Sequence, residues 1–292
     1  MKLRKIMIPF VETGTCDAAF DAGLALAKHF GSHLDVVHTR PRIVMPDGLY
    51  YPVVVPYIEA NYDALSEATT RAARELKARF DDLCSRHKLA VLDTDKAAAG
   101  TAEPAASWVE YEARSVYDLG NRARLRDLTV MVRPVTVDRH DEYGLMESIL
   151  FQSARPLLVL DGDRRMKRVP ATVVLAWNGG LEATRALSAA RPFLAAAQSV
   201  TVVAVGDIAE EGLSAEEAAR YLQLHDIAAQ GRTIRRDMFK RPENEFMELI
   251  EAEHPELVVM GAYSHSRARE AILGGFTRHL LHDANCPVLL CH

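Results

Sequence analysis

A stretch rich in glycine and arginine near the end of the chain has the residue types that bind phosphate. Gly261 closes an apolar run, and Gly274-Gly275 stand just before the helical pattern that leads into the last apolar run. Glycine has no Cβ and lets the backbone approach a ligand closely, while the N–H groups at a helix start favour an anion. Arg267, Arg269 and Arg278 place positive charge nearby. Taken alone, the glycines are explained equally well as turns.

The sequence lacks the signatures of the common nucleotide-dependent and hydrolytic enzymes. It contains no GxxxxGK(S/T), GxGxxG, HExxH or GxSxG. Ser264 and Ser266 flank His265, but neighbours in sequence do not form a catalytic triad, which is recognised by its geometry. We therefore predict no catalytic residues, and at most slow hydrolysis of a bound nucleotide.

Cysteine and histidine spacing does not predict a metal site or a disulfide. His279, His282 and Cys286 are spaced like ligands, but no second ligand pair accompanies them. The cysteines form no CxxC pair, and such residues are often small core residues. They are Cys16, Cys84, Cys286 and Cys291.

Length and composition indicate two ordinary globular domains. The chain has 292 residues, of which 49% are hydrophobic and 26% are charged. The formal net charge of −5 argues against nucleic acid as the main partner. No apolar run approaches the roughly 20 residues of a membrane helix, and the start, MKLRKIMIPF, lacks a secretory apolar region. We expect a cytoplasmic protein that binds neither nucleic acid nor membrane.

The chain consists of two copies of one β-α-β-α-β-α-β-α-β pattern. Continuous apolar runs are typical of parallel strands buried on both faces, and their alternation with helices predicts a doubly wound sheet in each copy. The matched segments are residues 5–10 with 172–177, 17–30 with 181–196, 34–38 with 199–205, 126–132 with 255–261, and 155–160 with 286–291.

The repeat sets the predicted domain boundaries at residues 1–163 and 169–292, with a charged linker that ends at Pro170. Insertions at residues 40–57 and 88–104 lengthen the first domain. The remaining elements are helices over 58–87, 115–124, 214–229 and 243–253, and strands over 108–111 and 232–236. A capping box of Ser214 and Glu217 supports the third of these helices.

The stretch that begins at Gly261 resembles the universal stress protein family, whose nucleotide-binding members carry Gly-x2-Gly-x9-Gly-(Ser/Thr) after the fourth strand. Gly261 and Gly274 match the first and third glycines. Ser264 stands at the second glycine and Gly275 at the hydroxyl residue, while Thr277 still offers a hydroxyl. The resemblance covers both copies. It implies two tandem Rossmann-like α/β domains of the adenine nucleotide α-hydrolase type, related by a pseudo-two-fold axis.

Further site residues follow from the same resemblance. Asn178 stands where members often have an aspartate after the first strand, Val205 matches a residue that lines the adenine pocket, and Met260 lies at the pocket wall. The implied ligand is ATP or a related adenine nucleotide, with or without Mg²⁺. The complete predicted set is Trp177, Asn178, Val205, Met260, Gly261, Ser264, Gly274, Gly275, Phe276 and Thr277.

The first copy departs from the family pattern at each of these places. Its fourth strand runs into Val132-Arg133-Pro134, and Pro134 has no N–H and keeps Arg133 extended. Val11 stands where the aspartate belongs, and Glu147-Ser148 stand near the position of the glycine pair. We predict no nucleotide in this half, although the charge of Arg133 could attract an anion.

Three functions stay open on the sequence alone. The leading one is a stress-response protein that binds ATP in its second half. The others are a tandem scaffold that binds protein partners without nucleotide, and a slow ATP hydrolase. Because an exposed apolar edge strand invites aggregation, we expect residues 157–160 and 288–291 to pair within the chain as a pseudo-dimer. Association of two such chains into a homodimer stays open.

Overall fold

The computed structural model describes residues 2–11, 16–42, 55–93, 103–113, 118–133, 140–162, 166–206, 213–235, 239–262 and 275–292. The first half contains β1 (Lys5–Pro9), α1 (Cys16–Phe30), β2 (His33–Pro41), α2 (Val55–His87), β3 (Ala90–Val91), β4 (Ala105–Ala113), α3 (Leu119–Ala123), β5 (Leu128–Val132), α4 (His140–Ser153) and β6 (Leu157–Leu160). The second half contains β7 (Thr172–Ala176), α5 (Leu181–Ala196), β8 (Ser199–Val205), α6 (Ala215–Gln223), β9 (Ala229–Ile234), α7 (Pro242–Glu253), β10 (Leu257–Gly261), α8 (Gly275–Asp283) and β11 (Val288–Cys291).

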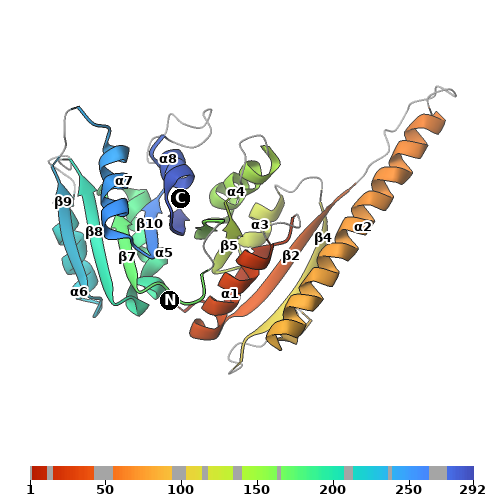
Figure 1. Ribbon diagram of the computed structural model, residues 1–292, viewed down its shortest axis with the longest axis horizontal. Coiled ribbons are helices and arrows are strands. Elements are labelled where there is room, and N and C mark those ends of the chain that lie inside the picture. The colour runs from red at the N-terminus through yellow and green to blue at the C-terminus, as the bar shows by residue number, and fades with distance from the viewer. Residues whose placement is uncertain are drawn as a thin grey trace.

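Within the described residues, eleven strands form one sheet in the order β3-β4-β2-β1-β5-β6-β11-β10-β7-β8-β9, which runs along the molecule (Figure 1). From outer strand to centre, β4-β2-β1-β5-β6 in one half repeats as β9-β8-β7-β10-β11 in the other. Neighbouring strands are parallel within each half. The predicted doubly wound α/β fold is confirmed.

The halves join through an antiparallel pairing of β6 with β11. Val159 lies opposite Val288, and Leu157 lies opposite Leu290. All four side chains are buried. An antiparallel junction between two copies of the same sheet places a pseudo-two-fold axis between them. The predicted pairing of the two last strands within the chain is confirmed.

Helices cover both faces of the sheet. α1, α2, α5 and α6 pack through one hydrophobic cluster, and α3, α4, α7 and α8 pack through a second. Successive strand residues alternate between them, so that Ile6 and Ile8 lie in the first cluster and Met7 in the second. Both clusters continue across the junction, where the ring centroids of Phe30 and Phe193 lie 5.7 Å apart. All four cysteines are buried, as expected of core residues.

Some predicted element bounds were wrong. The helix predicted over 214–229 ends at Gln223, because Asp226 adopts a left-handed turn (φ 58°) and β9 already starts at Ala229. The predicted capping box at its start is confirmed: the Ser214 hydroxyl accepts from the Glu217 N–H. The strand predicted over 108–111 extends over all of β4, and the helix predicted over 115–124 is the short α3. Part of the predicted insertion at 88–104 forms the edge strand β3, and residues 43–54 of the other insertion lie outside the described part. The boundaries at 163 and 169 stay predictions.

A buried charge cluster holds the amino ends of the first-half strands together. Asp35 of β2 is fully buried and accepts from the side chains of Lys5 (3.0 Å) and Arg126 (2.8 Å). His33 Nε2 lies 3.5 Å from the other carboxylate oxygen of Asp35 and 2.9 Å from the Ser107 hydroxyl. The cluster therefore joins β1, β2, β4 and the start of β5.

Acid should weaken the fold through His33. Burial lowers the pKa of His33, against an opposing effect of Asp35, while Lys5 lowers it further. The unfolded chain then binds a proton more readily than the folded protein does. Stability is complete above the unfolded-state pKa of about 6.5 and falls as the pH drops from there through the lower folded-state pKa. Urea unfolding between about pH 7.5 and 5 should show a steeper loss for the parent than for His33→Gln. Parallel pH profiles for the two proteins would contradict this.

Candidate functional site

The carboxyl ends of β7 and β10 form the topological switch point of the second half. From β7 the chain crosses to β8 on one side, while β10 pairs with the other side. The helices that follow β7 and β10, α5 and α8, pack on opposite faces of the sheet. Ligands of doubly wound sheets bind at such a point. Trp177-Asn178 follow β7, Val205 ends β8, and Gly261 ends β10.

Trp177 is a core residue at this edge of the sheet. Its side chain is 6% exposed and belongs to the α5 and α6 cluster. Its ring Nε1 donates to the carbonyl of Leu213 at 2.7 Å, just before the capping box of α6. Its backbone N–H donates to the Val203 carbonyl at 2.8 Å. The ring is therefore part of the core and is already hydrogen-bonded within the protein.

Asn178 shapes the turn into α5. Its Oδ1 accepts from the N–H of Gly180 at 3.0 Å, and Gly180 is the extended N-cap of α5. Between them Gly179 has φ 72°, a left-handed conformation that favours glycine. The Asn178 oxygen therefore closes an Asx turn that leads into α5, whereas the N-cap Gly180 has no side chain to bond the first-turn N–H groups.

The packing of α5 over the end of β10 requires a glycine at position 261. A Cβ at this position would lie 2.4 Å from the carbonyl carbon of Glu182 and 2.6 Å from the N of Ala183. The first turn of α5 therefore packs directly over the end of β10. The sequence interpretation assigned this glycine to ligand approach, whereas the close contact that it permits here is with helix backbone.

Of the other predicted site residues, some lie on the face of the sheet that α7 and α8 cover, and the rest lie outside the described residues. Met260 is buried, and Val205 is half-buried against the same cluster. Phe276 packs on Phe246 of α7 with ring centroids 5.4 Å apart, and Thr277 is buried in the first turn of α8. Gly275 is the first residue of α8. Ser264 and Gly274 lie outside the described residues, as do Arg267 and Arg269.

The sequence interpretation did not predict two features of this edge. Gly206 follows Val205 with φ 81°, and its N–H donates to the Ile234 carbonyl at 2.9 Å, so a glycine turns the chain at the end of β8. Leu181 and Leu213 are 70% and 57% exposed at the starts of α5 and α6. The glycine directly after a strand was the available signal, while the exposed leucines resemble core residues in sequence.

Comparison with known proteins gives a family match for the second half of the chain. Residues 171–292 match the model of the universal stress protein family. This match covers 122 of the 292 residues and lies entirely in the second half. A search of curated proteins gave no match.

Solved structures extend the likeness in fold to the whole chain. A universal stress protein from Archaeoglobus fulgidus is 12% identical with a TM-score of 0.68, and the alignment covers 99% of this chain and 96% of that chain. A putative universal stress protein from Pseudomonas aeruginosa is 13% identical with a TM-score of 0.56, and the alignment covers 99% and 93%. At these identities the likeness concerns the fold alone. No helix in the described residues has the length and apolar character needed to cross a membrane.

In the first half, the residue that follows β5 is held by contacts within the protein. Arg133, which follows β5, pairs with Asp161 at 3.0 Å. It also donates to the carbonyls of Leu281 and of Ala284, the latter at 3.2 Å. The expectation that Arg133 offers its charge to an anion was wrong, because a carboxylate and the end of α8 already engage the guanidinium.

The placement of Glu147 was also wrong. This residue lies within α4 rather than at a helix start, and burial raises the pKa of its carboxyl. α4 begins earlier than its counterpart α8, so Gly144 lies as far before β6 as Gly275 lies before β11. The first turn of α4 contains Asp141 and Glu142 instead.

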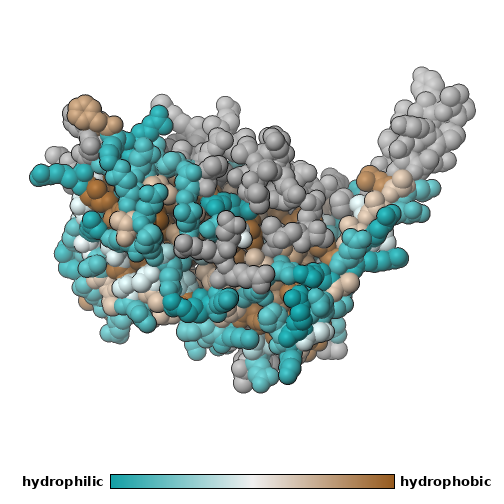
Figure 2. Space-filling model, viewed as in Figure 1, coloured by the Kyte–Doolittle hydropathy of each residue, from teal (hydrophilic) through white to brown (hydrophobic). Residues whose placement is uncertain are grey.

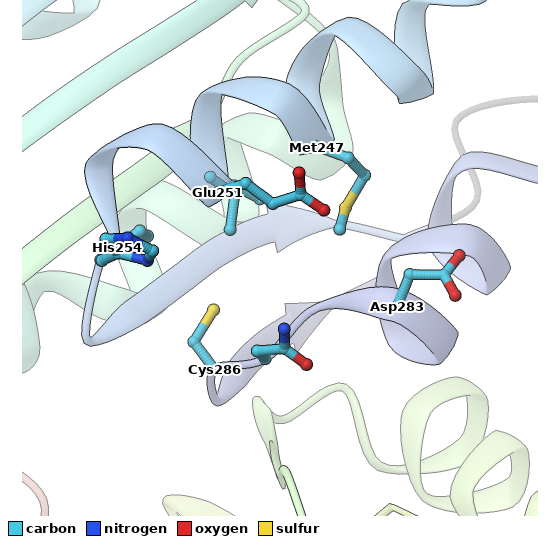
Figure 3. Close-up of a pocket in the computed structure, with 8 residues that line it drawn as sticks. Met247, Glu251, His254, Asp283 and Cys286 are labelled. Carbon is cyan, nitrogen blue, oxygen red and sulfur yellow. The ribbon is translucent and has the colours of Figure 1, made fainter.

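A separate shallow pocket lies at the opposite end of the second-half sheet (Figure 3). It occupies about 420 Å³, open mouth included, between the last turns of α7 and α8. Met247 and Glu251 reach down from α7 toward the side of Asp283 and Cys286 (Figure 3). The pocket borders the amino ends of β10 and β11, so it is distinct from the switch point.

Replacing Gly261 with alanine should destabilise the protein by about 1–3 kcal/mol, because the new methyl group meets backbone that cannot move aside easily. Gly162→Ala is the matched control, since a Cβ there meets only a Val132 methyl at 3.8 Å. Thermal unfolding of the two variants should show a clear loss for the first and a change within about 0.5 kcal/mol for the second. Equal midpoints would contradict the packing account.

Proposed function

We propose that the second half binds one adenine nucleotide, ATP or a close relative, and that the protein acts in a stress response through this binding. The observation that carries the proposal is the convergence of two helix starts on the switch point. α5 begins over the end of β10, and α8 follows the same strand end. The match of the second half to the universal stress protein family supports the same ligand class.

The start of α8 is the proposed phosphate contact. α8 runs from the carboxyl end of β10 toward the amino end of β11, so its N–H groups open at the switch point. Those groups have no partner within the helix and favour an anion. Gly275 stands where a hydroxyl residue would add one hydrogen bond, worth about 0.5–1.5 kcal/mol, or up to roughly tenfold in affinity. The substitution weakens such a contact without abolishing it.

The base is proposed to lie against the apolar side of the switch point. Val205 and Met260 line the α7 and α8 side of the sheet there. Leu181 and Leu213 leave exposed apolar surface at the starts of α5 and α6. Asn178 carries no charge and its oxygen is bonded to Gly180, so Mg²⁺ would accompany the phosphates rather than a carboxylate at this position.

A scaffold without nucleotide is the second candidate, favoured by three observations. Gly261 is explained by packing alone, and Arg133 closes the first-half site. α2 also extends beyond the sheet as an arm (Figure 1), and hydrophilic side chains cover much of its described surface (Figure 2). Such an arm offers a partner protein a site far from either switch point.

Mass spectrometry of ligand released from purified protein separates the two candidates, because only the first predicts a bound adenine nucleotide.

Calorimetric titration with ATP should give at most one site per chain. Gly274→Val should abolish it, because a branched side chain before Gly275 would occupy the phosphate position. Gly144→Val makes the same kind of change at the first-half counterpart of the neighbouring Gly275, and it should leave the stoichiometry and affinity unaltered. Two equivalent sites per chain, or parent affinity in Gly274→Val, would overturn the assignment to the second half.

A further inference from the structure

The end of α8 is held by the first half of the chain. Arg133 donates to the carbonyls of Leu281 and Ala284, which lie in and just after the last turn of α8. The contact joins residues 148 positions apart. Asp161 fixes the same guanidinium from the first-half side at 3.0 Å. The side chains of Arg133 and Asp161 are 20% and 8% exposed, so solvent screens these contacts only partly.

The two halves use equivalent positions here in different ways. The N–H of Arg133 donates to the Leu160 carbonyl at 2.9 Å, and the N–H of Ala262 donates to the Cys291 carbonyl at 2.7 Å. Arg133 is therefore the counterpart of Ala262, and Asp161 is the counterpart of His292. In the second half the pair is a hydrogen bond between His292 Nδ1 and the Ala262 carbonyl at 3.1 Å. Only the first half places a long cationic side chain at this point.

We propose that Arg133 and Asp161 form an interdomain clamp that fixes the position of α8 and thereby presents its N-terminus to the nucleotide. A cation at a helix C-terminus interacts favourably with the carbonyls and the dipole there. α8 has nine residues, so restraint at its last turn also orients its first. α8 is also held by packing, because Leu280 and Leu281 are buried in the same cluster as α7 and Phe276 contacts Phe246 of α7. The effect on ligand binding rests on the proposed function, whereas the restraint of α8 does not.

The experiment compares four variants of the full chain. Arg133→Met removes the charge and the donors, Arg133→Lys keeps a shorter cationic group, and Asp161→Asn removes the partner charge at constant shape. Arg155→Met is the matched control: Arg155 donates to the carbonyl of Arg124, the C-cap of α3, at 3.0 Å within the first half. Amide hydrogen exchange of residues 276–283 without ligand is measured first, and the dissociation constant for ATP second.

Arg133→Met should speed exchange in α8 roughly tenfold while the central strands keep parent rates, and should weaken ATP binding roughly five- to tenfold. Arg133→Lys should recover part of both effects, Asp161→Asn should give smaller ones, and Arg155→Met should change neither. Unchanged exchange in α8, or faster exchange spread evenly over all elements, overturns the clamp. If Arg133→Met does not fold, Asp161→Asn and Arg133→Lys decide by the same readouts. A parent that binds no ATP refutes the proposed function, and the exchange measurement still decides the clamp.

Discussion

The antiparallel pairing of β6 with β11 determines most of what surrounds both switch points. Because parallel strands on either side of this junction run in opposite directions, the carboxyl end of each half-sheet lies beside the amino end of the other. The last turn of α8 therefore comes to the end of β5, where Arg133 contacts it. By the same pseudo-symmetry, Phe151 in the last turn of α4 meets His292 after β11, with ring centroids 4.9 Å apart. Each half thus packs the end of a helix against the carboxyl edge of the other half's strands.

Because each half packs a helix end against the other, the two copies can keep one fold while the residues at their strand ends differ. A nucleotide crevice needs small residues and unpartnered helix N–H groups at the strand end, which Gly261 and Ala262 permit in the second half. The first half has lost that requirement, and Arg133 fills the equivalent space with contacts to the neighbouring domain. A buried guanidinium costs desolvation unless all its contacts are satisfied, and the paired carboxylate and carbonyls offset that cost. The first half therefore contributes to the placement of α8 in the second half.

The sequence predicted what local pattern determines and missed what distant contacts determine. Strands such as β6 and β11 were predictable because burial on both faces leaves a continuous apolar run. The start of α6 was predictable because Ser214 and Glu217 satisfy each other within one turn. Nothing near Asp35 in sequence reveals that Arg126, 91 positions away, will neutralise it. The partners of Arg133 lie in another domain. Glu147 was misplaced because α4 extends further toward the N-terminus than α8, a difference in helix length that aligned strands do not reveal.

Gly261 illustrates why a residue pattern and a packing explanation need not compete. The missing Cβ lets the backbone of Glu182 and Ala183 approach the end of β10. That approach draws the first turn of α5 over the switch point, so its N–H groups open toward the same edge as those of α8. A glycine that is required for helix packing therefore also determines where two positive helix ends converge. If the same glycine were replaced, α5 would move away from β10, and the loss of packing would also displace the N–H groups at the start of α5.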